Sequence, residues 1–260
     1  LKPNASGIIE PKSVRDAIQP NTLLVSLMMV NNETGNLTDF LTISKTCKEH
    51  GICFHSDATQ ALGKIDLPFC PDLPDLISFS GHKIYGPKGI GGLVNTSNKI
   101  LHALTFGGGQ ERSLRPGTLA VQQIVALAAC FNLMPFLHAE LPKIQQQKDK
   151  ILQGLLVDYI LNSSDNQSVP HILSLSIPDM DWEELFLKIP SIAVSNGSAC
   201  NAKSQLPSHV MKAYGHGDAL ALATIRISLS YLTQESDIDF LIDYYLLVCY
   251  TPHITFVIIY

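Results

Sequence analysis

The sequence lacks the features that mark several large classes of protein. Its 260 residues contain no run of lysine and arginine, and the formal net charge is -5, so nothing indicates a surface for nucleic acid or for an anionic membrane. No C-x-x-C pair occurs among the six cysteines, which argues against structural zinc and a disulfide framework. We therefore expect a small-molecule or protein partner, no metal, and a cytoplasmic or organellar matrix location.

Neither end of the chain carries a clear targeting signal. The first residues have no positive segment followed by an apolar stretch, so no secretory signal is indicated. The C-terminal segment 240–260 is long and apolar enough for a membrane-spanning helix to be considered, but Asp243, Pro252 and His253 interrupt it. A buried helix followed by a terminal strand or tail is the favoured interpretation of this segment.

The hydrophobic pattern predicts an α/β fold. Short apolar runs rich in β-branched residues alternate with helix-length amphipathic segments, which is typical of strands joined by crossover helices. A helix is expected over Leu37–His50, ended by Gly51. The predicted strands are Thr22–Val30, Ile52–Ser56, Leu76–Ser80 and Gly91–Val94.

The second half of the chain predicts a smaller α+β domain. The segment from about Val121 to Leu156 is strongly helical: VQQIVALAACFNLM comes first, and a polar amphipathic run follows Pro135. A long helix here would connect two domains. Strands are predicted at HILSLSI, IAVS and TIRISLS, and helices at MDWEELFLKI and from about Glu235. We expect residues 1–136 to belong to a large domain and residues 137–260 to form the small one.

Lys83 is the first candidate for chemistry. It follows a predicted strand in Ser80-Gly81-His82-Lys83 and precedes the turn Gly86-Pro87-Lys88-Gly89. A lysine at such a strand end can reach a cofactor aldehyde, and burial or nearby positive charge makes its amine nucleophilic. A solvated loop lysine is the alternative when the residue is taken alone. The turn is not a phosphate loop of the G-x-x-x-x-G-K-[ST] type, because that spacing is absent.

Asp57 and Cys200 are the other two candidates. Asp57 comes at the end of a predicted strand, where open α/β sheets bind ligands, and a carboxylate there can keep a pyridinium nitrogen protonated. Its alternative role is a helix N-cap. Cys200 lies in the small polar run Ser195–Asn201, whose lack of apolar periodicity predicts an exposed loop and hence a candidate nucleophile. The other five cysteines lie in apolar or amphipathic runs and are interpreted as structural.

Six blocks of sequence, in order, resemble the cysteine desulfurases, pyridoxal-phosphate enzymes of class V in the fold-type I aminotransferase superfamily. The blocks are Val30–Gly35, Asp57–Gln60, Ser80–Lys83 with its Gly-Pro-Lys-Gly tail, Gly107–Arg112, Arg115–Thr118 and Ser198–Cys200. The resemblance extends from about Gly7 to about Leu246. It implies an incomplete, mainly parallel-sheet large domain that binds the cofactor, and a small domain that carries the cysteine loop. It also implies that the family's N-terminal part, with a phosphate-binding turn and a ring-stacking histidine, is missing from this chain.

The resemblance assigns a role to each matched residue. Lys83, Cys200 and His82 would be catalytic: Lys83 forms the Schiff base with the cofactor, and Cys200 takes the sulfur. Asn32 and Arg226 would hold the substrate carboxylate, for which an arginine fork is suited. The residues implied to bind pyridoxal 5'-phosphate are Asp57 at the ring nitrogen, Gln60 at the ring oxygen, Lys83 at the aldehyde, and Ser80, His82 and Thr118 at the phosphate.

The implied reaction turns L-cysteine into L-alanine and leaves the sulfur on the enzyme as a persulfide, for iron–sulfur cluster or other sulfur-containing cofactor biosynthesis. Thr118 resembles the residue that reaches the phosphate of the neighbouring subunit, so a homodimer is implied. The loop around Cys200 looks like the longer type that serves scaffold or other sulfur-acceptor proteins. Two alternatives stay open: a selenocysteine lyase, and a catalytically silent homologue that acts as a binding or dimerisation module.

Overall fold

The computed structural model describes residues 1–68, 70–97, 99–164, 166–178, 180, 195 and 206–250. The chain forms two compact units. The first comprises Leu1, Ile9–Asn31 and Leu37–Ala139, and the second comprises Lys2–Ile8, Asn32–Asn36 and the chain from Glu140 onward. Two short segments of the N-terminal half therefore belong to the second unit. The assignment of residues 1–136 and 137–260 to a cofactor-binding and a small domain stays a prediction.

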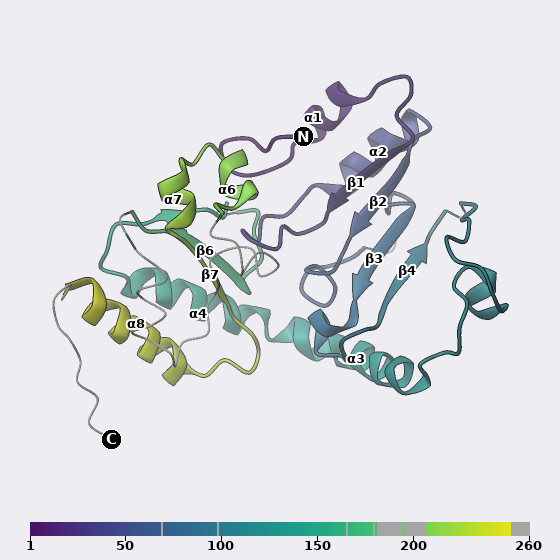
Figure 1. Cartoon of the computed structure of the whole chain (residues 1–260). Coiled ribbons are helices and arrows are strands. Elements are labelled where there is room, and N and C mark those ends of the chain that lie inside the picture. The colour runs from purple at the N-terminus through teal and green to yellow at the C-terminus, as the bar shows by residue number, and fades with distance from the viewer. Residues whose placement is uncertain are drawn as a thin grey trace. The chain divides into compact units, whose positions relative to one another are not determined.

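A four-stranded sheet in the order β1-β2-β3-β4 organises the first unit (Figure 1). β1 (Leu24–Met28), β2 (Cys53–Asp57) and β3 (Leu76–Ser80) are parallel, and β4 (Gly91–Asn95) runs antiparallel to β3. The register pairs Met28 with Asp57 and Asp57 with Ser78, so the carboxyl ends of the three parallel strands lie at one edge. Ligands bind at this edge in open α/β sheets.

The crossover from β1 to β2 is α2 (Phe40–Glu49). The carboxylate of Asp39 caps this helix by accepting the N–H of Thr42 at 3.1 Å. Its apolar face, which includes Ile43, is buried, and α2 packs against β2 and against the short α1 (Pro11–Ala17). The helix thus covers part of the sheet and returns the chain to the start of β2, as the parallel pairing requires.

The long helix of the first unit is α3 (Val121–Ala139). Its residues Leu127 and Cys130 pack with Ile84 of the 3-10 turn η1 (Gly81–Ile84). α3 continues through Pro135 to Ala139, so this proline does not divide the segment that was predicted to be helical. A proline inside a helix removes one N–H from the hydrogen-bond ladder, and α3 continues despite this loss. The break falls at Glu140, which is the N-cap of the next helix.

By length and composition, α3 is the one helix in the described part of the chain that could cross a membrane. Of the apolar stretch of this helix, 17% is buried within the chain. Core helices of water-soluble proteins pass the same test, so the helix by itself assigns no membrane. The C-terminal segment forms α8 (Glu235–Tyr250), in which Ile238 and Leu241 are buried, and residues 251–260 lie outside the described residues.

A three-stranded antiparallel sheet in the order β5-β6-β7 forms the second unit, from β5 (Ile160–Leu161), β6 (Ile172–Ser176) and β7 (Thr224–Ser228). The helices α4 (Leu141–Gly154) and α8 pack on each other, and α6 (His209–Ala213) and α7 (Asp218–Leu222) are short. The core joins these helices to the sheet through Ile144, Ile151, Leu173, Leu175, Ile225, Ile227, Ile238 and Leu241.

The strands of the first unit were predicted to within one or two residues, and Leu76–Ser80 without error. HILSLSI and TIRISLS contain β6 and β7, and α8 begins at Glu235 as expected. The elements α1, β5, α6 and α7 were not predicted, since each is at most seven residues long and shows little periodicity. The predicted helix MDWEELFLKI and strand IAVS lie outside the described residues, apart from Met180 and Ser195.

Candidate functional site

The candidate site of the first unit lies at the carboxyl ends of β2 and β3. β2 ends at Asp57, β3 ends at Ser80, and the turn η1 directly after β3 contains His82 and Lys83. A Cβ on Gly86 would lie 2.8 Å from the carbonyl oxygen of Gly81, so this close return of the chain towards β4 requires glycine. The sheet register and this turn therefore bring the predicted residues of two separate blocks to one edge.

The polar groups at this edge are partly paired and partly open. Asp57 Oδ1 accepts the N–H of Thr59 at 2.8 Å, which is the Asx-type contact that starts a turn, so one carboxylate oxygen does serve as a cap. The hydroxyl of Ser80 and Nδ1 of His82 lie 2.7 Å apart and form one hydrogen-bonded pair. The side chain of Lys83 is half-buried. Together these groups offer a carboxylate, a hydroxyl, an imidazole and an amine to a ligand.

Gln60 lies in a coiled segment that follows β2. The N–H of Leu62 donates to Ala58 O at 2.9 Å, and the N–H of Ile65 donates to Ala61 O at 3.0 Å, so residues one turn apart share a side. Lys64 Nζ donates to Gln60 Oε1 at 3.4 Å. Burial, and second the positive charge of Lys83, lower the pKa of Lys64 to about 8. Sequence reasoning missed Lys64, although its i, i+4 spacing from Gln60 was a usable signal.

The second unit brings Asn32 and Arg226 together, although they are 194 positions apart. Arg226 Nη1 donates to the carbonyl oxygen of Asn32 at 2.9 Å. The main chain of Arg226 in β7 also pairs with Ser195, with N···O distances of 2.7 and 3.2 Å. Cys200 follows Ser195 by five positions and lies outside the described residues. Ser195 is thus paired with β7 at the arginine predicted to bind substrate.

The segment Asn32–Asn36 is held in the second unit by buried polar contacts. Ser208 Oγ donates to the carboxylate of Glu33 at 2.5 Å, and the hydroxyl of Tyr214 donates to Thr34 Oγ1 at 3.1 Å. Burial raises the pKa of Tyr214, so this hydroxyl stays a donor at physiological pH. Asn36 is buried and bonds to three separate stretches of chain. These contacts determine where Asn32 presents its groups to Arg226.

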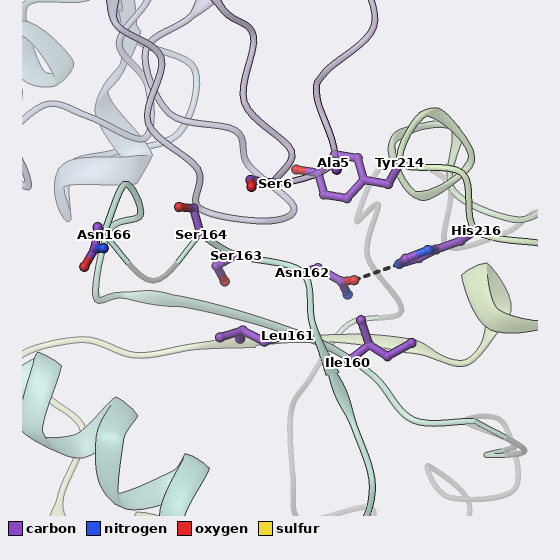
Figure 2. Close-up of a pocket in the computed structure, with 10 residues that line it drawn as sticks. All are labelled: Ala5, Ser6, Ile160, Leu161, Asn162, Ser163, Ser164, Asn166, Tyr214 and His216. Atoms are coloured by element: carbon purple, nitrogen blue, oxygen red, sulfur yellow. Dashed lines mark hydrogen bonds between the residues drawn. The ribbon is translucent and has the colours of Figure 1, made fainter.

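A polar pocket of about 420 Å³ also lies in the second unit, and Figure 2 shows its lining. His216 Nε2 and Asn162 Oδ1 are 2.8 Å apart, and Asn162 Nδ2 donates to Ser174 and Ser176. Burial lowers the pKa of His216, which favours its neutral form. The lining contains none of the predicted site residues and no Lys, Arg, Asp or Glu, and its amide and imidazole bond mainly to each other and to the sheet. We interpret the pocket as part of the polar packing of the second unit rather than as a binding site.

Two further sequence predictions concern Thr118 and the remaining cysteines. Thr118 lies between η2 (Gln110–Ser113) and α3 and is exposed. Cys47 is buried, and burial, followed by the charge of Asp75 and by Cys53, raises the pKa of its thiol to about 11. A thiol that stays protonated at neutral pH is a poor nucleophile. Among the described residues, no group of three or more His, Cys, Asp or Glu could hold a metal ion.

Comparison with known proteins decides the family. The family model for class-V aminotransferases matches residues 1–241. The chain belongs to the class-V aminotransferase family. Among curated class-V relatives, cysteine desulfurase IscS of Methylococcus capsulatus is 44% identical over 249 residues, which are 94% of this chain and 62% of the relative. The IscS of Acinetobacter baumannii is 44% identical over 90% of this chain and 59% of its own length. The chain thus spans about three fifths of these relatives.

Solved structures agree with this family and confirm the predicted α/β architecture of fold type I. A NifS-like protein matches 96% of this chain and 67% of its own, with a TM-score of 0.86 and 28% identity. The structure of SspA in complex with cysteine matches 88% of this chain and 65% of its own, with a TM-score of 0.77 and 37% identity. A NifS-like protein from Rickettsia africae matches with a TM-score of 0.82 and 28% identity, over 96% of this chain and 69% of its own.

Proposed function

We propose that this class-V aminotransferase chain carries the core of a cysteine desulfurase, which converts L-cysteine into L-alanine. The observation that carries the proposal is the grouping of Asp57, Ser80, His82 and Lys83 at one edge of the sheet. These residue types in this arrangement suit a phosphorylated pyridine aldehyde. Support comes from two relatives named cysteine desulfurase at 44% identity and from a similar structure that is a complex with cysteine.

The residues at this edge fit pyridoxal 5'-phosphate. When bound, this cofactor supplies an aldehyde for an amine and a ring that accepts electrons. Lys83 would offer the amine. Asp57 accepts the N–H of Thr59 through Oδ1, and its other oxygen, Oδ2, would hold a proton on the ring nitrogen. The Ser80–His82 pair, 2.7 Å apart, would donate to the phosphate. Gln60 would hydrogen-bond the ring oxygen.

The second unit would supply the substrate groups. Arg226, with Asn32 beside it, would bind the carboxylate of cysteine. Its planar guanidinium can donate two parallel hydrogen bonds to a carboxylate, which a lysine ammonium cannot. Cys200 would accept the sulfur: the S–C bond of the substrate breaks, an S–S bond forms at Cys200, and the two thiol hydrogens end on the persulfide and on the methyl group of alanine. Because Ser195 pairs with β7 at Arg226, the short connection to Cys200 supports this role.

We propose the following for assembly and location. Thr118 is exposed, which supports a contact with the phosphate of a second subunit in a homodimer. An iron–sulfur scaffold or another sulfur-acceptor protein would then receive the sulfur from Cys200. Free thiols at Cys47, Cys53, Cys70 and Cys130 support a reducing location such as the cytoplasm or an organellar matrix. Residues 1–136 would be the part that binds the cofactor, and residues 137–260 the small domain.

The test is cofactor binding followed by turnover. Pyridoxal 5'-phosphate added to the 260-residue chain is expected to give the near-visible absorbance band of a lysine-bound cofactor. Lys83→Ala should abolish this band, whereas Lys88→Ala, an exposed lysine of the neighbouring turn, should retain it. Failure of Lys83→Ala to change the band would refute the proposal for Lys83.

Turnover separates the desulfurase from its alternatives. Sulfide release from cysteine in the presence of a reducing thiol should be lost in Cys200→Ser. Faster turnover of selenocysteine than of cysteine would point to a selenocysteine lyase instead. A chain that binds the cofactor and releases neither sulfide nor selenide would be a silent homologue.

A further inference from the structure

His55 lies in the middle of β2, and both nitrogens of its imidazole are hydrogen-bonded. Nδ1 lies 2.8 Å from the hydroxyl of Ser26 in β1, and Nε2 lies 2.9 Å from the hydroxyl of Ser78 in β3. One side chain therefore joins the three parallel strands, which lie side by side in Figure 1. The function proposed above gives His55 no role.

This line of three side chains lies next to the proposed cofactor site. Residues two apart in a strand point to the same face of a sheet, so His55 shares a face of β2 with Asp57, and Ser78 shares a face of β3 with Ser80. The register pairs Asp57 with Ser78, which places all of these side chains on one face. Along β2, the Cα atoms of His55 and Asp57 are about 7 Å apart.

The main-chain register between β2 and β3 stops short of Ser80. It covers three pairs and ends with Asp57 and Ser78. Ser80 lies two residues further along β3, where its register partner is Gly91 of β4. The distance between Asp57 and Ser80 therefore depends on how firmly the last pairs of β2 and β3 are held, and the hydrogen bond from His55 to Ser78 acts at that point.

The chemistry of the three side chains suits a stable connection. A hydroxyl can donate or accept, so it pairs with an imidazole nitrogen whether or not that nitrogen carries the proton. The opposite face of β2 is buried through Phe54 and Ser56, whereas His55 is half-buried and Ser26 is exposed. Substitutions in this line should therefore change the connection between the strands while the buried face of β2 keeps its packing.

We propose that His55 is a positioning residue of the candidate cofactor site. By joining β1 and β3 to β2, its imidazole sets the distance between Asp57 and the Ser80–His82 pair. A ligand that bonds to both at once, through a ring nitrogen and a phosphate, gains affinity from a fixed distance because less conformational freedom is lost on binding. The benefit to pyridoxal 5'-phosphate rests on the function proposed above, whereas the joining of the strands is independent of any ligand.

The first test measures amide hydrogen exchange in the ligand-free chain. The N–H of Met29 donates to Asp57 O at 2.9 Å, and the N–H of Ala58 donates to Ser78 O at 2.8 Å, so these two amides report on the strand ends beside Asp57. Ser26→Ala, at an exposed position, should make Met29 exchange about threefold to tenfold faster, the factor that corresponds to one lost hydrogen bond. Ser26→Thr keeps the hydroxyl and should exchange as the original chain does.

His55→Phe keeps a ring and removes both hydrogen bonds, so exchange should become faster at Met29 and at Ala58. Unchanged exchange of these amides in His55→Phe and in Ser26→Ala would overturn the proposal. The matched control is His102→Phe, at an exposed histidine of the first unit, which should exchange as the original chain does.

The second test compares two ligands, pyridoxal 5'-phosphate and pyridoxal, which lacks the phosphate. Absorbance titrations give the dissociation constant of each. In His55→Phe, the constant for pyridoxal 5'-phosphate should rise about tenfold, and that for pyridoxal by less than about twofold. A variant that is merely less stable weakens both ligands by the same factor, because it lowers the fraction of competent chain. An equal change for the two ligands, or no change, would refute the positioning role.

Ser26→Ala decides the question even if His55→Phe does not fold. It should raise the constant for pyridoxal 5'-phosphate about threefold, and Ser26→Thr should restore it; equal constants in these two variants would count against the proposal. Failure of the proposed function would look different. Neither ligand would then give a lysine-dependent absorbance band in the original chain, while the exchange of Met29 would still respond to the loss of the Ser26 hydroxyl.

Discussion

Replacing Asn36 with alanine should destabilise the second unit strongly. Asn36 is 3% exposed, and its Nδ2 donates to the hydroxyl of Tyr214 at 2.9 Å and to the carbonyl oxygens of Ser6, Gly7 and Asn162 at 3.2 to 3.4 Å. Its Oδ1 accepts the N–H of Ser164 at 2.7 Å. A single amide group therefore links the segments 2–8 and 160–166 to the residues after α6.

The magnitude follows from the two short bonds and the groups left behind. The contacts with Tyr214 and Ser164 are each worth about 1 kcal/mol net. Leaving the part-buried N–H of Ser164 and a carbonyl without partners costs about 1 kcal/mol more for each, the lower end of the usual range because this N–H is only partly buried. The longer contacts share the same two hydrogens and add little. Asn36→Ala should therefore lose about 4 kcal/mol of the free energy of unfolding.

Urea unfolding followed by far-ultraviolet circular dichroism measures this loss, with Asn166→Ala as the matched control. Asn166 lies in the same unit but is exposed, so its removal should change stability by less than about 0.5 kcal/mol. Amide hydrogen exchange should also show earlier exchange at Ser164 in Asn36→Ala.

The consequence for function is separate and also measurable. Since Asn32–Asn36 is one short segment of the second unit, loosening Asn36 should displace Asn32 from Arg226 and raise KM for cysteine more than it lowers kcat. A loss of stability equal to that of the control, together with unchanged exchange at Ser164, would refute the reasoning that Asn36 joins these segments.

Three further predictions concern the carboxylate site, a glycine and a buried thiol. Arg226→Lys should raise KM for cysteine about tenfold by loss of the bidentate fork, with the cofactor absorbance unchanged; an unchanged KM would contradict the carboxylate role. Gly7→Ala should cost about 2 to 3 kcal/mol in urea unfolding, because φ is +76° there and a Cβ would lie 2.2 Å from the hydroxyl of Tyr214. Burial raises the pKa of Cys47 from 9.0 to about 11, so the folded thiol keeps its proton while the unfolded thiol ionises. The free energy of unfolding should fall by at most about 1.4 kcal/mol per pH unit from pH 9 to 11. This part of the pH dependence should be absent in Cys47→Ala.

The local features of the chain could be predicted from the sequence. β3 and its neighbours were found because apolar, β-branched runs bounded by turn residues depend only on nearby residues. The order of Asp57, Ser80, His82 and Lys83 was sufficient to place them at strand ends. The parallel register then brings those ends to one edge, so this half of the candidate site follows from short-range pattern plus one rule of sheet geometry.

The tertiary structure decided everything that depends on contacts between distant residues. Nothing in the local pattern indicates that Asn32–Asn36 leaves the first unit for the second, or that Asn36 joins three separate stretches of chain. The pKa of Lys64 likewise depends on burial and on Lys83, which only the folded chain brings near it. Hydrophobic periodicity reports which face of an element is buried, whereas hydrogen bonds and charge interactions depend on which residues meet there, and that is determined by the fold as a whole.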